Sequence, residues 1–275
     1  MFITNKRQTV RDLTARSRQI FPTIIILKLL LVPTLIGLVT LSGRRWGPQI
    51  AGWLSAFPIV AGPILFFIAA DQGQEFAVTA ATGTLSAVFA IIVFGLAYAW
   101  SALKFNWIGS LAIALFFYCL AVLGLTAVSL NLYSAAVISL LATIAAPRFF
   151  PVVSSVPLAL KPSNFDLPLR MASGAILVLL VTGFAIKLGP RLSGILAMFP
   201  IMSSVLTVFS HRSVGKEFAI NLLKGMLFGW YSFSTFCFAL ALLLPGLKTE
   251  IAFLIATLAA FVVQFGSRRF LIKSR

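Results

Sequence analysis

Three charged side chains that could do chemistry lie in or beside long apolar stretches of this 275-residue chain. Glu75 and Glu217 each open a long apolar run, and Lys224 lies about two turns inside the second run. An ammonium within an apolar span costs roughly 2.5–3.5 kcal/mol on insertion scales and usually faces a cavity or a partner. We therefore predict that Lys224 binds substrate and that Glu75 and Glu217 carry a coupling ion or a proton.

Each of these residues also has a simpler interpretation. Lys224 could snorkel to the membrane interface, and the two glutamates could complement the dipoles of the helices that they open. Glu217 shares a helix face with Lys224, so the two are candidate partners, although direct contact would need a water molecule or bending of the helix. Lys28, which aligns with Arg170 at the edge of its span, is expected near the lipid headgroups.

Two Phe-Pro pairs lie inside apolar stretches and form the best candidate for a binding site. A proline removes a backbone donor and clashes with the preceding turn, so the helices are expected to be kinked or broken there. The half-helix that follows such a break presents free amides and a positive dipole end, which can hold an anion. Alternatively, the pairs are packing kinks and the nearby glycines let helices approach closely. The predicted substrate-binding residues are Gly52, Phe57, Pro58, Gly194, Phe199 and Pro200, together with Lys224.

Catalytic groups are scarce. The single histidine, His211, rules out most metal clusters and any Ser-His-Asp arrangement in the membrane, and it is expected to be a loop residue. The six acidic residues show no paired spacing. We predict that the chain is not an enzyme and holds neither a metal nor another cofactor.

One stretch of the chain occurs twice. Residues 47–85 and 189–227 align without a gap at a constant offset of 142 positions. The aligned pairs are Gly47/Gly189, Pro48/Pro190, Gly52/Gly194, Phe57/Phe199, Pro58/Pro200, Gly73/Gly215, Glu75/Glu217, Phe76/Phe218, Ala77/Ala219 and Gly83/Gly225. A duplicated unit in an apolar chain is a familiar ground plan of secondary transporters, whose substrate sites lie where the copies meet.

The composition identifies an integral membrane protein. The chain is 60% hydrophobic and 10% charged, whereas soluble domains carry about 25% charged residues. The net charge of +16 resides in tails and loops, which is typical of orientation signals, and without an aromatic-interleaved basic patch we expect no binding to nucleic acid. Cys119 and Cys237 fall in apolar segments and are expected to act as small hydrophobes.

The predicted fold class is an all-α polytopic membrane protein with two homologous four-helix repeats and a linker helix. The predicted spans are 20–42, 49–70, 76–102 and 106–126 in the first copy, 132–146 in the linker, and 169–187, 192–210, 218–244 and 249–266 in the second copy. The predicted divisions are a basic cytoplasmic tail (1–19), repeat one (20–126), a linker helix with a proline-rich loop (127–168), repeat two (169–266) and a basic C-terminal tail (267–275). Hydropathy favours nine crossings and the positive-inside rule favours eight.

The repeated motif resembles the GlpM-like family of small bacterial membrane proteins. In the second copy the matching residues are Ser193-Gly194, Phe199-Pro200, Gly215, Glu217, Ala219 and Gly225-Met226. In the first copy they are Ala51-Gly52, Phe57-Pro58, Gly73, Glu75, Ala77 and Gly83, and this copy lacks the tryptophan that follows the motif at Trp230. The resemblance covers about forty residues in each half. It implies a four-span unit fused to itself in a bacterial inner (plasma) membrane, and it implies no particular activity.

Two functions fit these patterns. The first is a small secondary transporter or permease for a small-molecule substrate, anionic in one interpretation, with its pathway between the repeats. The second is a non-transporting membrane scaffold or regulatory subunit of a larger assembly. The expected partners are the lipid bilayer, the substrate and a second copy of the chain.

Overall fold

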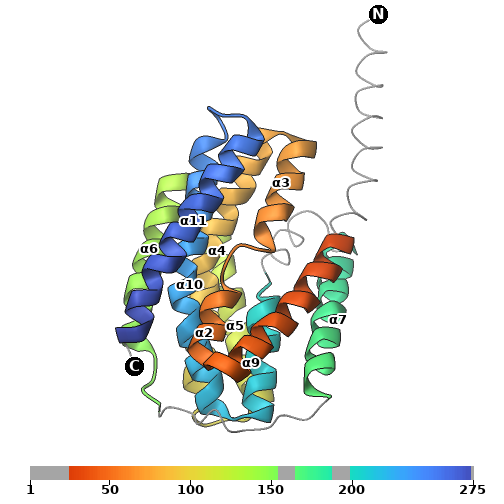
Figure 1. Cartoon of the computed structure of the whole chain (residues 1–275), viewed down its shortest axis with the longest axis vertical. Helices are drawn as coiled ribbons and strands as arrows, with labels where there is room; N and C mark the ends of the chain where they lie inside the picture. Colours follow the sequence, from red (N-terminus) through yellow and green to blue (C-terminus); the bar gives the residue numbers. More distant parts are fainter. Residues whose placement is uncertain (1–24, 154–164, 188–198, 274–275) are drawn as a thin grey trace, which may run out of the picture.

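The structure is a computed structural model that describes residues 25–153, 165–187 and 199–273. The described residues form a bundle of helices (Figure 1), which confirms the all-α class. Within the described ranges, six helices are long and apolar enough to cross a membrane, so the chain is a multi-pass membrane protein. They are Ile25–Trp46, α4 (Gln74–Ser101), α5 (Trp107–Ala127), α6 (Leu132–Phe149), α10 (Lys216–Leu243) and α11 (Thr249–Lys273, apolar over Thr249–Ser267).

The remaining described helices are α2 (Pro48–Ser55), α3 (Ala61–Gln72), α7 (Asp166–Lys187) and α9 (Ile201–Ser213). Large apolar side chains face outward from the long helices, as expected of a surface in contact with lipid tails. Leu123 on α5, Val137 on α6 and Val262 on α11 are each more than half exposed. Two apolar clusters fill the interior and are built largely from α4 and α10.

Local sequence accounts for where several helices begin. The Asn106 side chain accepts a hydrogen bond from Gly109 N at the start of α5, and Asn131 does the same for Ser134 N at the start of α6. Gly73 and Gly215 precede α4 and α10 with φ of 89° and 126°, a conformation that favours glycine.

The two ends of the bundle can be defined by contacts between helix termini. At one end, the Gln74 end, the Gln74 side chain donates to the carbonyl of Leu247, so the start of α4 lies beside the end of α10. At the other end, the Arg44 end, the Tyr98 hydroxyl lies 3.1 Å from Nδ1 of His211, so the end of α4 lies beside the segment that leads into α10. Helix α4 starts at the Gln74 end, where α10 ends, and α4 ends where α10 starts. The two helices pack on each other and run in opposite directions (Figure 1).

Glycines set the closest approach between helices in the interior. A Cβ added at Gly52 of α2 would overlap the carbonyl oxygen of Leu222 and lie 2.7 Å from Met226 N. A Cβ at Gly225 of α10 would overlap the Gln49 carbonyl of α2. Backbone therefore meets backbone between α2 and α10, as small residues allow in membrane helix packing.

Candidate functional site

The first Phe-Pro pair breaks its span, as predicted. Helix α2 ends at Ser55 and α3 begins at Ala61. Between them, Ile59 N donates to the Phe57 carbonyl at 2.8 Å, and Gly62 N donates to the Pro58 carbonyl at 2.9 Å. The second proline of this span, Pro63, lies in the first turn of α3, where a missing N–H costs no helical hydrogen bond.

The second Phe-Pro pair has the same local geometry. Ile201 N donates to the Phe199 carbonyl at 2.8 Å, and Ser204 N donates to the Pro200 carbonyl at 2.8 Å. Pro200 caps the start of α9. Each of these backbone bonds lies 142 positions after its equivalent in the first pair.

Aromatic contacts join each break to a helix from the other half of the chain. The Phe57 ring centroid lies 4.7 Å from that of Phe261 on α11. The Phe199 ring meets Tyr118 on α5 edge-on at 6.3 Å. Pro58 and Pro200 are buried, and the two phenylalanines are half-buried.

Of the two glycines predicted to bind substrate, the structure describes Gly52. Gly52 is buried against the backbone of α10, which is the packing alternative for this residue. A direct contact between Gly52 and substrate stays a prediction. Gly194 lies outside the described residues.

The predicted charged residues are not brought together in the described structure. Glu75 is exposed in the first turn of α4, at the Gln74 end. Glu217 is half-buried in the first turn of α10, close to His211 at the opposite end. Lys224 is half-buried on α10, and within the described ranges it forms no hydrogen bond or ion pair, including with Glu217. The binding and coupling roles of these residues stay predictions.

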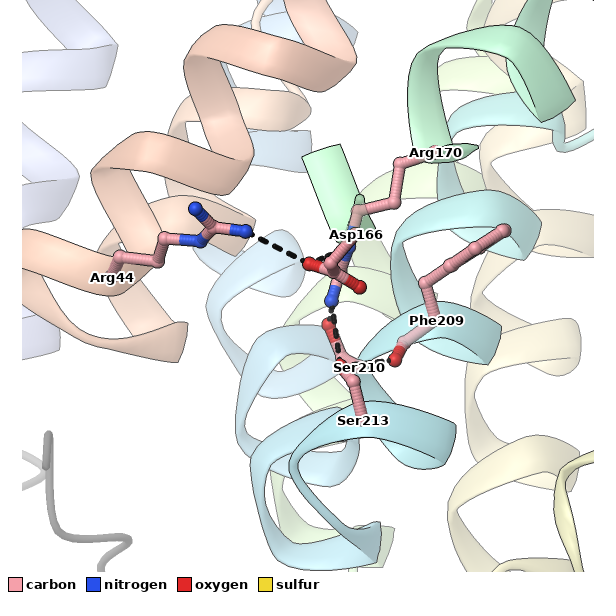
Figure 2. A network of polar contacts seen from close by, with 6 residues as sticks. All are labelled: Arg44, Asp166, Arg170, Phe209, Ser210 and Ser213. Carbon is pink, nitrogen blue, oxygen red and sulfur yellow. Dashed lines mark hydrogen bonds and ion pairs between the residues drawn. The ribbon is translucent and has the colours of Figure 1, made fainter. Parts of the chain in front are cut away.

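The structure assembles a charged cluster that the sequence did not predict (Figure 2). Asp166 Oδ2 accepts hydrogen bonds from Arg44 Nη2 at 3.0 Å and from Arg170 Nε at 2.9 Å. Arg170 also donates to the hydroxyls of Ser210 and Ser213, at 3.2 and 2.9 Å. The cluster links the helix Ile25–Trp46 to α7 and to the last turn of α9 at the Arg44 end.

Burial makes this cluster unusual for a helix end. Arg170 is 4% exposed and Asp166 is 9% exposed. The Arg170 guanidinium also lies 5.6 Å from the Phe209 ring centroid, within reach of a cation–π interaction (Figure 2). The four-residue spacing of Asp166 and Arg170 was the one sequence signal for the pair.

A second unpredicted contact joins Tyr98 and His211 at the same end. His211 was expected in a loop, but the structure places it in the last turn of α9. Because α9 continues three residues past the predicted span end at 210, the imidazole reaches the Tyr98 hydroxyl on α4.

Helix α9 carries buried hydroxyls between the break and the charged cluster. Ser203, Thr207 and Ser210 share one helix face because they are spaced by four and three residues. The hydroxyl oxygens of Thr207 and the adjacent Ser204 are buried and have no hydrogen-bond partner in the described structure. Unsatisfied buried hydroxyls are rare in folded proteins, so this face of α9 is a place where a ligand would be stabilised.

No protein-family model, curated protein or solved structure matches this chain.

Proposed function

We propose that the protein is a secondary transporter whose pathway follows the hydroxyl face of α9, between two inverted copies of one unit. The observation that carries the proposal is the pair of breaks at Phe57-Pro58 and Phe199-Pro200. The two breaks have the same pattern of backbone hydrogen bonds at equivalent positions. Discontinuous helices in repeats of opposite orientation are the usual frame for substrate sites in transporters. Backbone that leaves the helix within a membrane is tolerated where it is buried in protein or faces water.

Element positions support the inverted duplication. Helices α4 and α10 begin 142 residues apart and end 142 residues apart, and α5 and α11 also begin 142 residues apart. The contacts between helices follow the same correspondence: α5 packs on α9, and the equivalent helices α11 and α3 also pack on each other. The antiparallel packing of α4 and α10 favours a pseudo-two-fold axis in the membrane plane.

The two half-helices differ in a way that supports a site on α9. The positions in α3 that correspond to Ser203, Ser204, Thr207 and Ser210 are Ala61, Gly62, Leu65 and Ile68. Both halves therefore have the broken span, but the buried hydroxyls occur in the second half and have no equivalent in α3. A common scaffold does not need these hydroxyls, since α3 is built without them.

The decisive test asks whether water reaches this face of α9. In a background with Cys119 and Cys237 replaced, single cysteines at Ser204 and Thr207 are compared with cysteines at Val205 and Leu206. All four positions are buried in the described structure, at 5, 0, 5 and 1% exposure, respectively. A membrane-impermeant anionic methanethiosulphonate should label Ser204→Cys and Thr207→Cys at least about tenfold faster, because the reagent needs a hydrated thiolate.

The controls separate transport from scaffolding. Labelling from both sides of the membrane, in separate experiments, indicates alternating access. Equal and negligible labelling at all four positions would contradict the pathway and favour the scaffold. Equal and fast labelling would mean that α9 is loosely packed, which would also contradict a defined pathway.

Replacing Lys224 by methionine tests the cation within the membrane. Its equivalent in α4 is Thr82, so the fold does not require a charge there. We expect Lys224→Met to insert as well as the native protein and to reduce counterflow of a small anion about thirtyfold, as losing about 2 kcal/mol of charge pairing implies. Counterflow in proteoliposomes with phosphate, succinate and lactate measures the effect. Thr82→Met is the matched control, and equal rates in both variants would show that Lys224 only snorkels.

A further inference from the structure

The charged cluster at the Arg44 end holds more positive than negative charge. Two guanidinium groups share the single carboxylate of Asp166, and both of their hydrogen bonds go to the same oxygen, Oδ2 (Figure 2). Within the described ranges, Asp166 is the only acidic residue in an ion pair. Among the described residues, the cluster therefore has one more positive than negative charge, and its buried part, Arg170 and Asp166, is largely desolvated, so an anion would be favoured there.

The two arginines are not equivalent. Arg170 uses all three of its guanidinium nitrogens, on Asp166, Ser210 and Ser213. Arg44 uses Nη2 alone among the described contacts, and its side chain is 32% exposed. Arg44 therefore has donors left for a ligand that arrives from the aqueous side, and an arginine fork matches the two oxygens of a carboxylate or phosphate.

The position of the cluster connects it to the hydroxyl face of α9. Ser210 binds Arg170 and lies one turn after Thr207, whose hydroxyl has no described partner. A group leaving the cluster along this face meets Thr207 and then Ser203 on its way to the break at Pro200. The charged cluster thus lies at one mouth of the proposed pathway.

We propose that Arg44 and Arg170 form an oxyanion-binding site that Asp166 occupies in the absence of ligand, and that the transported substrate is a small carboxylate or phosphate. The identity of the substrate rests on the proposed transport function, whereas anion binding at the cluster does not. Asp166 acts as an internal competitor: the incoming oxyanion takes over hydrogen bonds from the guanidinium groups.

Chemical rescue of Asp166→Ala tests the site without a transport assay. Removing the carboxylate leaves two unpaired guanidinium groups and a space that formate or phosphate can fill. In purified protein in phosphatidylcholine nanodiscs, either anion should raise the melting temperature of the variant by about 5 °C at a hundredfold excess over its dissociation constant. Choline chloride at equal ionic strength should give no such shift. Absence of rescue by both anions would overturn the site.

Asp166→Asn keeps the shape of the side chain and covers the case in which the alanine variant does not fold. If Asp166 occupies the site about nine-tenths of the time, removing this competitor tightens ligand binding roughly tenfold. We therefore expect phosphate to bind Asp166→Asn about tenfold more tightly than it binds the native protein, measured by calorimetry. Phosphate binding to Asp166→Asn that is weaker than, or equal to, binding to the native protein would contradict the proposal.

Two controls define the residues and the source of the oxyanion. Adding Arg44→Gln to Asp166→Ala should abolish the rescue, whereas adding Arg45→Gln should not, because Arg45 is exposed and stacks on Trp46. Nanodiscs with phosphatidylglycerol test a lipid headgroup as the source. Rescue by that lipid alone, with none by dissolved formate or phosphate, would overturn the inferred substrate class. Rescue by dissolved anions together with no cysteine labelling along α9 would retain the site and reject transport.

Discussion

Replacing Gly225 by alanine should destabilise the protein by at least about 3 kcal/mol, the upper part of the range for overpacked interiors. The added Cβ would overlap the Gln49 carbonyl oxygen and lie 2.7 Å from the Gln49 Cα. Both obstacles are backbone atoms, which cannot rotate away, so α2 would have to move off α10. Thermal unfolding in detergent should show a melting temperature lower by roughly 6–12 °C.

Gly124→Ala is the matched control for this prediction. Gly124 is also a glycine within a long helix, and a Cβ added there meets nothing within 4 Å in the described structure. Alanine at this position should leave stability unchanged or raise it by about 0.5–1 kcal/mol, because alanine is the better helix former. Similar melting temperatures for Gly225→Ala and Gly124→Ala would show that α2 and α10 are not packed as closely as described.

Replacing Pro58 or Pro200 by alanine should leave insertion intact and reduce anion counterflow to below about a hundredth of the native rate. Each proline lies where its span leaves the helix, and alanine permits the helix to continue through that point. A continuous helix withdraws the free amides of the break and displaces the groups beside it. Misplacement by about 1 Å is sufficient for a hundredfold loss in a positioned site.

Pro147 provides the control for a proline that does not break its helix. It lies within α6, which continues to Phe149. Pro147→Ala should transport at the native rate. Full activity in both Pro58→Ala and Pro200→Ala would return the Phe-Pro pairs to a packing role, and activity lost in one variant alone would confine the site to that copy.

The features that sequence predicted well are those governed by neighbouring residues. The prolines at 58 and 200 lie outside regular helix because a proline acts on its own turn. Helices α5 and α6 begin within a residue or two of the predicted positions, since asparagine caps act locally. The linker helix was also predicted, although it continues through Pro147 to Phe149.

The charged cluster could not be predicted because its members are far apart in sequence. Arg44 and Asp166 are separated by 122 positions, and Ser213 follows Arg170 by 43. Apolar periodicity does not show which helix ends meet, so sequence placed Arg170 merely at the edge of a span. Close helix packing at Gly52 was predicted as an alternative role, but its partner could not be identified for the same reason, since Leu222 lies in the other half of the chain.

The direction of the first and last described helices determines which compartment each reaches. The helix Ile25–Trp46 runs towards the Arg44 end. Helix α11 starts beside Gln74 and brings Ser267 to Trp53 near the Arg44 end, so it runs the same way. A described chain whose first helix starts at the Gln74 end and whose last helix runs to the Arg44 end crosses an odd number of times, which favours nine crossings over eight.

The charges at the two described ends of the bundle indicate how the protein is oriented. At the Arg44 end, the described helix ends and turns carry the cations Arg44, Arg45, Lys104, Arg148, Arg170, Arg212 and Lys216, against the acidic residues Asp166 and Glu217. At the Gln74 end, they carry Asp71, Glu75, Lys248 and Glu250. The positive-inside rule counts cations in short loops, so this asymmetry favours a cytoplasmic Arg44 end, opposite to the orientation that the basic N-terminal tail predicts. In that orientation the oxyanion site opens to the cell interior and would meet the anion pool of the cytoplasm first.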